Sequence, residues 1–203
     1  MAMTRESDRA VFLDKDGTLI DDVAYNVDPV RITLARGAAE GLYLLVRRGY
    51  RIVVVSNQPG VALGIFPEHA LGGVESRLRE LLRDVGVPLS GFHYCPHLPG
   101  GRLPEYAVPC ACRKPASGLL SRAAREHGLD LASSWMVGDI LDDVEAGRGA
   151  GCRTVLIDNG NETEWDLTPG RRPDKVAADL FEAAALIVSD DARVGPVLMC
   201  GTA

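Results

Sequence analysis

The chain has few long hydrophobic runs and no excess of positive charge. Apolar stretches such as residues 53–55 have the length of a strand and are too short to span a membrane. Residues 1–17 also lack the apolar segment of a signal peptide. Because the formal net charge is −6, non-specific binding to nucleic acid is disfavoured. We therefore expect a cytoplasmic protein with neither a membrane nor a nucleic acid as its partner.

Cysteine is scarce and odd in number, with five residues in a chain of 203. In a reducing compartment, clustered thiols indicate metal binding or catalysis before they indicate disulfides. Three of the five lie between residues 95 and 112. Cys152 and Cys200 stand apart, and we read them as a semi-buried side chain and a tail thiol.

Short β-branched runs alternate with segments of helical spacing along the chain. Expected strands cover residues 9–14, 50–57, 91–95, 134–139 and 153–157, and expected helices cover residues 36–49, 67–86, 117–128 and 141–151. A last short strand and helix fall within residues 176–190, after a polar surface loop at 158–175. The alternation predicts a three-layer α/β/α domain with a mostly parallel sheet. We place this single domain at residues 1–190 and a C-terminal tail at 191–203.

Polar side chains follow the predicted strands where each strand ends. Asp14 and Asp16 follow the first strand, Ser56 and Asn57 the second, and Asp139 a later one. In open parallel sheets, ligands bind at the carboxyl ends of the strands. These residues are therefore the first candidates for a functional site.

The segment FLDKDGTLID carries two carboxylates two positions apart. Asp14 can attack phosphorus as a nucleophile, and Asp16 can protonate the leaving oxygen and later deprotonate water. Two neighbouring acids repel each other, so a cation is expected between them. The alternative is a structural Asp-Gly turn between two elements.

Further strand-end residues fit the same phosphate chemistry. Ser56 and Asn57 can donate hydrogen bonds to a phosphoryl oxygen, and Lys114 can clamp the nucleophile and the phosphate. Asp139 offers hard oxygen ligands to Mg²⁺. Asp143, at the start of the next helix, either orients the site or stabilises the helix dipole.

The segment YCPHLPGGRLPEYAVPCACRKP combines three thiols with one imidazole. Its pattern is Cys-x-His, twelve residues, then Cys-x-Cys, which is a closed tetrahedral ligand set for a structural Zn²⁺. Disulfides or unliganded thiols are the alternative. Arg113 and Lys114 follow directly, so a bound zinc would fix both cations beside the site. The predicted zinc ligands are Cys95, His97, Cys110 and Cys112.

The order D-x-D-G-T, Ser-Asn, Lys and G-D-x-x-x-D resembles the haloacid dehalogenase-like phosphohydrolases. The resemblance covers residues 11 to about 157. It implies a Rossmann-like sheet without a large cap domain, an aspartyl-phosphate on Asp14, and acid–base catalysis by Asp16. It also implies a catalytic Mg²⁺ held by Asp14, Asp139 and the backbone carbonyl of Asp16.

Within this family, the segments SNQPGVALG and CACRKPASGLL are similar to members that act on heptose 1,7-bisphosphate. Such members remove the 7-phosphate during the synthesis of nucleotide-activated heptose. The resemblance implies a phosphorylated sugar as the substrate. The candidate contacts to it are Asp22, Tyr25, Asn57, Gln58 and Arg113, and we expect a monomer.

Three positions that bear on substrate recognition depart from the pattern of the heptose enzymes. Val23 and Ala24 replace a His-Gly pair, and Ile140 replaces a lysine. Histidinol phosphate or another small phosphomonoester therefore stays open as the substrate. A third hypothesis, a non-catalytic zinc-stabilised binding module, requires the loss of a catalytic group.

Overall fold

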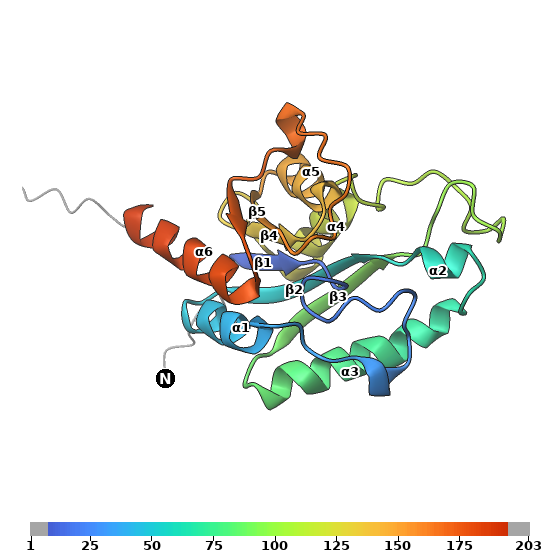
Figure 1. Ribbon diagram of the computed structural model, residues 1–203, viewed down its shortest axis with the longest axis horizontal. Helices are drawn as coiled ribbons and strands as arrows, with labels where there is room; N and C mark the ends of the chain where they lie inside the picture. The colour runs from blue at the N-terminus through green and yellow to red at the C-terminus, as the bar shows by residue number, and fades with distance from the viewer. Residues whose placement is uncertain (1–7, 195–203) are drawn as a thin grey trace, which may run out of the picture.

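The structure, a computed structural model, describes residues 8–194. Its centre is a single sheet of parallel strands in the order β3-β2-β1-β4-β5-β6 (Figure 1). The strands are β1 (Ala10–Leu13), β2 (Arg51–Asn57), β3 (Leu89–Cys95), β4 (Trp135–Gly138), β5 (Arg153–Ile157) and β6 (Lys175–Ala177).

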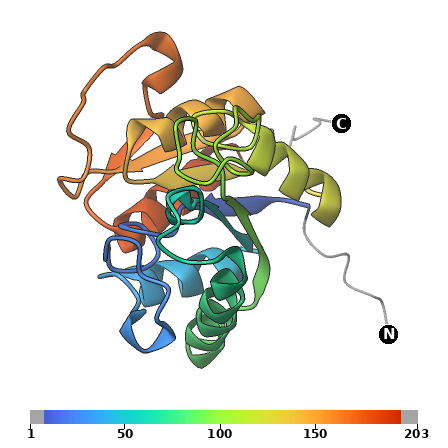
Figure 2. The same ribbon diagram turned by 90° about the vertical axis from the view of Figure 1, so that its right-hand side faces the viewer.

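Helices cover both faces of the sheet, which confirms the predicted three-layer α/β/α architecture. One face carries α1 (Ala38–Arg47), α3 (Leu71–Asp84) and α6 (Leu180–Val194), and the other carries α4 (Gly118–His127) and α5 (Leu141–Ala150). Figure 2 shows the two layers on opposite sides of the strands. The short elements are α2 (Pro59–Ala62), η1 (Pro29–Arg31), η2 (Glu68–Ala70) and η3 (Pro169–Arg171).

Strand β1 shows why a continuous apolar run forms a central parallel strand. Val11 and Leu13 pack into the core under α1, α3 and α6, while Ala10 and Phe12 pack into the core under α4. All four side chains are fully buried. Burying a side chain such as Phe12 stabilises the fold by roughly 1.5–3 kcal/mol.

The strand order reverses between β1 and β4, because β2 and β3 extend the sheet on one side and β5 and β6 on the other. A crevice for ligands forms at such a switch point, outside the carboxyl ends of the strands. The Asp14 N–H donates to the Val137 carbonyl oxygen at 2.9 Å. Asp14 is thereby fixed at this point of the sheet.

The last helix, α6, runs past residue 190, where the sequence predicts the domain to end. The predicted start of the tail at residue 191 lies inside α6, where Asp190 pairs with Arg153 at 2.5 Å and with Lys175 at 3.1 Å. Asp191 accepts from Arg9 at 2.9 Å. Residues 195–203, including Cys200, lie outside the described residues, so the extent of the domain and the tail stay predictions.

The segment after β5 contains only the short helix η3 before β6 begins. It is largely exposed, as expected for a polar loop. Its first residues nevertheless fold back over the carboxyl end of the sheet, where Asn159 Nδ2 donates to the Gly17 carbonyl oxygen at 2.7 Å. Within residues 8–194, no helix is both long enough and apolar enough to cross a membrane.

Candidate active site

A small polar cavity lies at the carboxyl ends of β1, β2 and β4. Its volume is about 240 Å³. The structure brings most of the predicted site residues together here: the lining consists of Asp14, Asp16, Asp22, Ser56, Asn57, Lys114, Asp139, Ile140 and Asn161.

Lys114 lies between two buried carboxylates. Its Nζ is 2.5 Å from Asp14 Oδ1 and 2.5 Å from Asp143 Oδ1, and it also donates to the Val55 carbonyl oxygen at 3.0 Å. Burial alone would lower the pKa of Lys114, but the two carboxylates outweigh burial and raise it. The ammonium group is therefore charged at neutral pH and holds one oxygen of Asp14 in place.

Asp139 is the second carboxylate that the sequence predicts as a metal ligand. Its Oδ2 accepts from Asn161 Nδ2 at 2.6 Å, and its Oδ1 accepts from Thr18 Oγ1 at 3.3 Å. Burial, together with the nearby Asp14 carboxylate, raises the pKa of Asp139 to about 6. The site therefore carries negative charge that a cation would stabilise.

Gly17 allows the chain to turn tightly beside Asp139. Its φ is +77°, in the left-handed region that glycine adopts without strain. A Cβ atom at this position would lie 2.1 Å from Asp139 Oδ2 and 2.5 Å from Asn161 Nδ2. Any side chain here would displace both residues, so the close approach requires glycine.

Asp16 lies across the cavity and is held by two neighbours. Its Oδ1 is 2.7 Å from Lys15 Nζ, and its Oδ2 accepts from Gln58 Nε2 at 3.3 Å. Burial raises the pKa of Asp16, although Lys15 opposes this effect. Gln58 also donates to Ser56 Oγ at 2.8 Å, which links the ends of β1 and β2. A carboxyl group with a raised pKa is suited to donating a proton.

The side chain of Asn57 binds the backbone of Lys114. Its Nδ2 donates to the Lys114 carbonyl oxygen at 3.0 Å, and its Oδ1 accepts from the Lys114 N–H at 3.0 Å. Both polar atoms thus hold the Lys114 backbone. The structure shows the side chain positioning the lysine, and the predicted phosphate contact of Asn57 stays a prediction.

Three predicted sugar-contacting residues take different places. Asp22 lines the cavity. Tyr25 is 49% exposed and does not line it. Arg113 lines a separate hollow of about 340 Å³ with Lys114 and Cys110, and its Nη1 donates to the His97 carbonyl oxygen at 3.3 Å. Of the three, only Asp22 faces the carboxylates directly.

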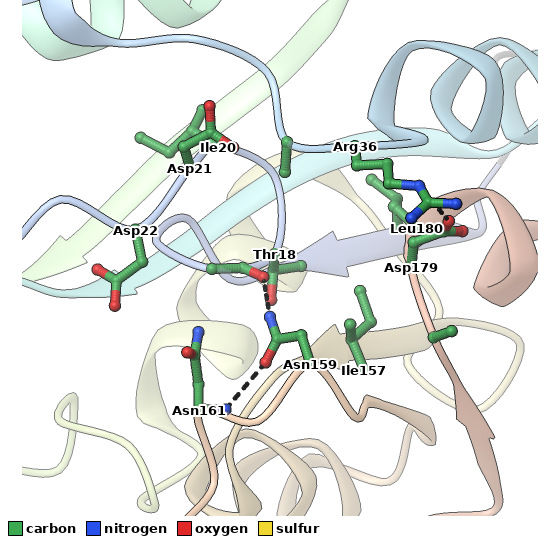
Figure 3. A pocket seen from close by; sticks show the side chains of 13 residues that line it. Thr18, Ile20, Asp21, Asp22, Arg36, Ile157, Asn159, Asn161, Asp179 and Leu180 are labelled. Atoms are coloured by element: carbon green, nitrogen blue, oxygen red, sulfur yellow. Dashed lines mark hydrogen bonds and ion pairs between the residues drawn. The ribbon is translucent and has the colours of Figure 1, made fainter.

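A second cavity of about 440 Å³ adjoins the first and shares Asp22 and Asn161 with it. Figure 3 shows Thr18 and Asn159 in the middle of this cavity, with Asp22 and Asn161 on one side of them and Arg36 beside Asp179 on the other. The Arg36–Asp179 separation is 3.9 Å, and the arginine side chain is 94% exposed. The two cavities together offer space for a substrate larger than phosphate.

The four predicted zinc ligands form one compact cluster at the loop after β3. Cys112 Sγ lies 3.1 Å from Cys95 Sγ and 3.3 Å from Cys110 Sγ, and its distance to His97 Nδ1 is 3.4 Å. The cysteines are free thiols. A tetrahedral Zn²⁺ with Zn–S bonds of about 2.3 Å separates its sulfur ligands by about 3.8 Å. The cluster fits zinc after a small outward movement of the sulfur atoms, and its closed ligand set matches a structural site.

The catalytic carboxylates also fit a metal ion. Asp14, Asp139 and Asp143 each place a carboxylate oxygen within 4.8 Å of the others. Lys114 supplies a single positive charge to this group. The remaining negative charge and the hard oxygen donors fit Mg²⁺.

The sequence did not reveal the full role of three residues near the cavity. Asp143 is fully buried against Lys114, which makes it part of the site and not only a residue that stabilises the helix dipole. Lys15 is 1% exposed beside Asp16, and Asn161, which belongs to the predicted surface loop, contacts Asp139. The G-D-x-x-x-D motif could have identified Asp143, because it places this residue in the first turn of α5, directly after the strand end that carries Asp139. The sequence around Asn161 carries no comparable signal.

The fold and the cavity define a haloacid dehalogenase-like hydrolase. A family model described as HAD-hydrolase-like matches residues 111–183. Among curated proteins, the chain is 40% identical over 159 residues to the D-glycero-beta-D-manno-heptose-1,7-bisphosphate 7-phosphatase of Pasteurella multocida, covering 78% of this chain and 86% of the relative. The chain belongs to the haloacid dehalogenase-like phosphatase family that contains these heptose bisphosphate phosphatases.

Two further comparisons support this family assignment. The relative of the same name from Escherichia coli K12 is 38% identical over 167 residues, covering 78% of this chain and 87% of the relative. A crystal structure of D,D-heptose 1,7-bisphosphate phosphatase from B. bronchiseptica, complexed with magnesium and phosphate, matches with a TM-score of 0.73 and 27% identity. That match covers 90% of this chain and 99% of the other. The protein is therefore a phosphatase.

Proposed function

We propose that the protein is a Mg²⁺-dependent phosphatase that removes the 7-phosphate of D-glycero-D-manno-heptose 1,7-bisphosphate. This activity serves the synthesis of ADP- or GDP-heptose for surface polysaccharide. The observation that carries the reaction is the Asp14 carboxylate, which Lys114 holds at 2.5 Å in a small polar cavity beside Asp139. The substrate is inferred from the names of the relatives.

The first step is nucleophilic attack by Asp14 on the phosphorus of the 7-phosphate. One oxygen of Asp14 is held by Lys114, and the other forms the new bond to phosphorus. The bond between phosphorus and the C7 oxygen breaks, and Asp16 protonates that oxygen as it leaves. The raised pKa of Asp16 supports this role, because the carboxyl group more readily carries a proton.

The second step returns Asp14 to its free form. Asp16, now a carboxylate, takes a proton from water, and the water oxygen attacks the phosphorus of the aspartyl-phosphate. The bond between phosphorus and Asp14 breaks, and inorganic phosphate leaves. Lys114 stabilises the charge on the Asp14 carboxylate in both steps.

Asp14, Asp139 and the backbone carbonyl of Asp16 would hold the Mg²⁺ ion. When bound, Mg²⁺ neutralises charge on the phosphoryl oxygens and orients them for in-line attack. Asn161 and Thr18 hold the Asp139 carboxylate in the orientation this requires. Ser56, in the wall of the cavity, contacts a phosphoryl oxygen.

The zinc loop has a structural role in this proposal. It ends at Cys112, two residues before Lys114, and the Asn57 side chain fixes the Lys114 backbone from the other side. Zinc and Asn57 together determine where the ammonium group lies. Arg113 and Tyr25 reach the distal part of a bound sugar from the rim of the site, while Asp22 binds a sugar hydroxyl.

Histidinol phosphate is the alternative substrate. Ile140 lines the catalytic cavity, where the heptose enzymes carry a lysine. An apolar side chain here cannot pair with a second phosphate, which favours a monophosphate. A non-catalytic binding module is not retained, because Asp14, Asp16, Lys114 and Asp139 surround one cavity.

The deciding experiment measures phosphate release with Mg²⁺ from heptose 1,7-bisphosphate and from histidinol phosphate side by side. We expect a higher kcat/KM for the heptose, and loss of both activities in Asp14→Asn. Preference for histidinol phosphate would reassign the substrate and make Ile140→Lys the next variant. Unchanged activity in Asp14→Asn would contradict the mechanism itself.

We further propose that the enzyme acts in the cytoplasm as a monomer. One chain supplies every group named in the mechanism, so the reaction requires no second copy. Light scattering on the purified, active protein should give the mass of a single chain. Activity that disappears on dilution together with a dimer would contradict this proposal.

A further inference from the structure

A cluster of histidines lies outside the catalytic cavity and outside the predicted zinc site. His93 is on β3, and His127 is the last residue of α4, which packs on the same face of the sheet. Their Nε2 atoms are 3.1 Å apart, and their rings are nearly perpendicular at 83°. No role in the proposed reaction accounts for this pair.

Two imidazole nitrogens this close cannot face each other with lone pairs alone, because the lone pairs repel. Either a proton or a metal cation must lie between them. Two nitrogen ligands at about 2.0–2.1 Å from a tetrahedral Zn²⁺ are about 3.3–3.4 Å apart. The observed separation of 3.1 Å is close to that distance.

A third donor comes from Glu126, next to His127 in sequence. Its Oε2 lies 3.7 Å from His93 Nδ1, which is the ring nitrogen that does not face His127, so the carboxylate must turn to share an ion with the two Nε2 atoms. One donor atom from each of the three residues lies within 4.8 Å of the other two. Glu126 is about half exposed, and its other neighbour is Arg122, at 3.9 Å. Its carboxylate can therefore turn toward the two imidazoles at little cost.

The surrounding chain keeps this arrangement in place. The His127 carbonyl oxygen accepts from Arg51 Nη1 at 2.9 Å, which ties the end of α4 to β2. His93 is 7% exposed. A Cβ atom at Gly91 would lie 2.5 Å from His127 Nε2 and 2.9 Å from His93 Nε2. The absence of a side chain at Gly91 thus creates the space in which the two rings meet.

We propose that His93, His127 and Glu126 bind one transition-metal ion, most favourably Zn²⁺. Two imidazoles and one carboxylate suit Zn²⁺ and its neighbours Co²⁺, Ni²⁺ and Cu²⁺, and are poor ligands for Mg²⁺. Water completes the coordination sphere on the exposed side of Glu126. The ion joins β3 to the end of α4, the two elements that flank the zinc loop.

Co²⁺ titration of the purified protein, with its zinc loop filled and saturating Mg²⁺ present, tests the proposal. The large excess of Mg²⁺ competes with Co²⁺ for the catalytic carboxylates. We expect one equivalent of Co²⁺ to bind, with weak d–d absorption bands and no thiolate charge-transfer band. A thiolate band would instead show exchange into the cysteine cluster and would count against the site.

Substitutions at the proposed site identify which residues bind the metal ion. His127→Ala should lose this equivalent of Co²⁺, and Glu126→Gln should weaken its binding by about tenfold. His69→Ala, a histidine outside the cluster, should bind as the wild type does. Circular dichroism and phosphatase activity check that each variant is folded. No saturable uptake by the wild type, or undiminished uptake by His127→Ala, would show that a proton alone joins the two rings.

Discussion

Asn57 and Lys114 form a paired contact in which one amide side chain binds both polar groups of one backbone position. The Asn57 side chain donates to the Lys114 carbonyl oxygen and accepts from the Lys114 N–H, each at 3.0 Å. The end of β2 thereby fixes the chain that leaves the cysteine cluster. The lysine ammonium group is then directed at Asp14.

Asn57→Ala should lower kcat by about 10- to 100-fold, because the Lys114 backbone loses both of these bonds. Mg²⁺ binding should change little, since Asn57 does not contact Asp139. Steady-state kinetics and calorimetric Mg²⁺ titration separate the two effects. Asn26→Ala, at a partly exposed loop position that does not line the cavity, is the control. A variant with full kcat would show that Lys114 holds its position without Asn57.

Asn161→Ala should weaken Mg²⁺ binding by about tenfold, because Asp139 loses the donor at 2.6 Å that orients it. Asn161→Asp should be worse, since it places a further negative charge against a carboxylate. Calorimetry on the free enzyme gives the Mg²⁺ affinity directly. Equal affinity in the wild type and in both variants would mean that Asn161 has no part in orienting the metal ligand.

Mg²⁺ affinity should depend on pH through Asp139. The pKa of this group is raised to about 6 in the metal-free protein, so it is protonated below that pH and must lose the proton to bind the ion. Affinity should be constant above about pH 7 and fall by about tenfold per unit below pH 6. Calorimetry across this range measures the effect. A Mg²⁺ affinity that stays constant down to pH 5 would contradict this role of Asp139.

Zinc removal should lower both stability and kcat, because the loop that leads to Lys114 loses its fixed point. Cys112→Ser should bind less zinc, melt at a lower temperature and lose most of its activity. Cys152→Ala, a buried cysteine outside the cluster, should keep its zinc content. Metal analysis measures the zinc content, thermal melting measures the stability, and steady-state kinetics measures kcat. A zinc-free variant with normal kcat would limit the loop to a role in stability.

Truncation of a core side chain tests the packing of the fold independently of the catalytic activity. Phe12→Ala should lower the free energy of unfolding by about 3–5 kcal/mol, because the aromatic ring is fully buried between β1 and the α4 layer. Val30→Ala, at an 86% exposed position, should change it by less than about 0.5 kcal/mol. Urea unfolding measures both. Similar values for the two variants would contradict the burial of Phe12.

The strands and helices could be predicted because their patterns are local. The four zinc ligands could also be predicted, since their spacing and residue types are specific. Asn161 could not be, because its contact with Asp139 depends on how the loop after β5 folds back. Likewise, the sequence showed that Asn57 follows a strand, but only the structure shows that its side chain binds Lys114.

The most direct test of the central claim is to trap the covalent intermediate. Enzyme, Mg²⁺ and heptose 1,7-bisphosphate are mixed, quenched in acid within one turnover and reduced with borohydride, which converts an aspartyl-phosphate to homoserine. Peptide mass spectrometry should find homoserine at position 14, and only in samples that received substrate. Homoserine at another aspartate, or phosphate release with no modified residue, would contradict Asp14 as the nucleophile.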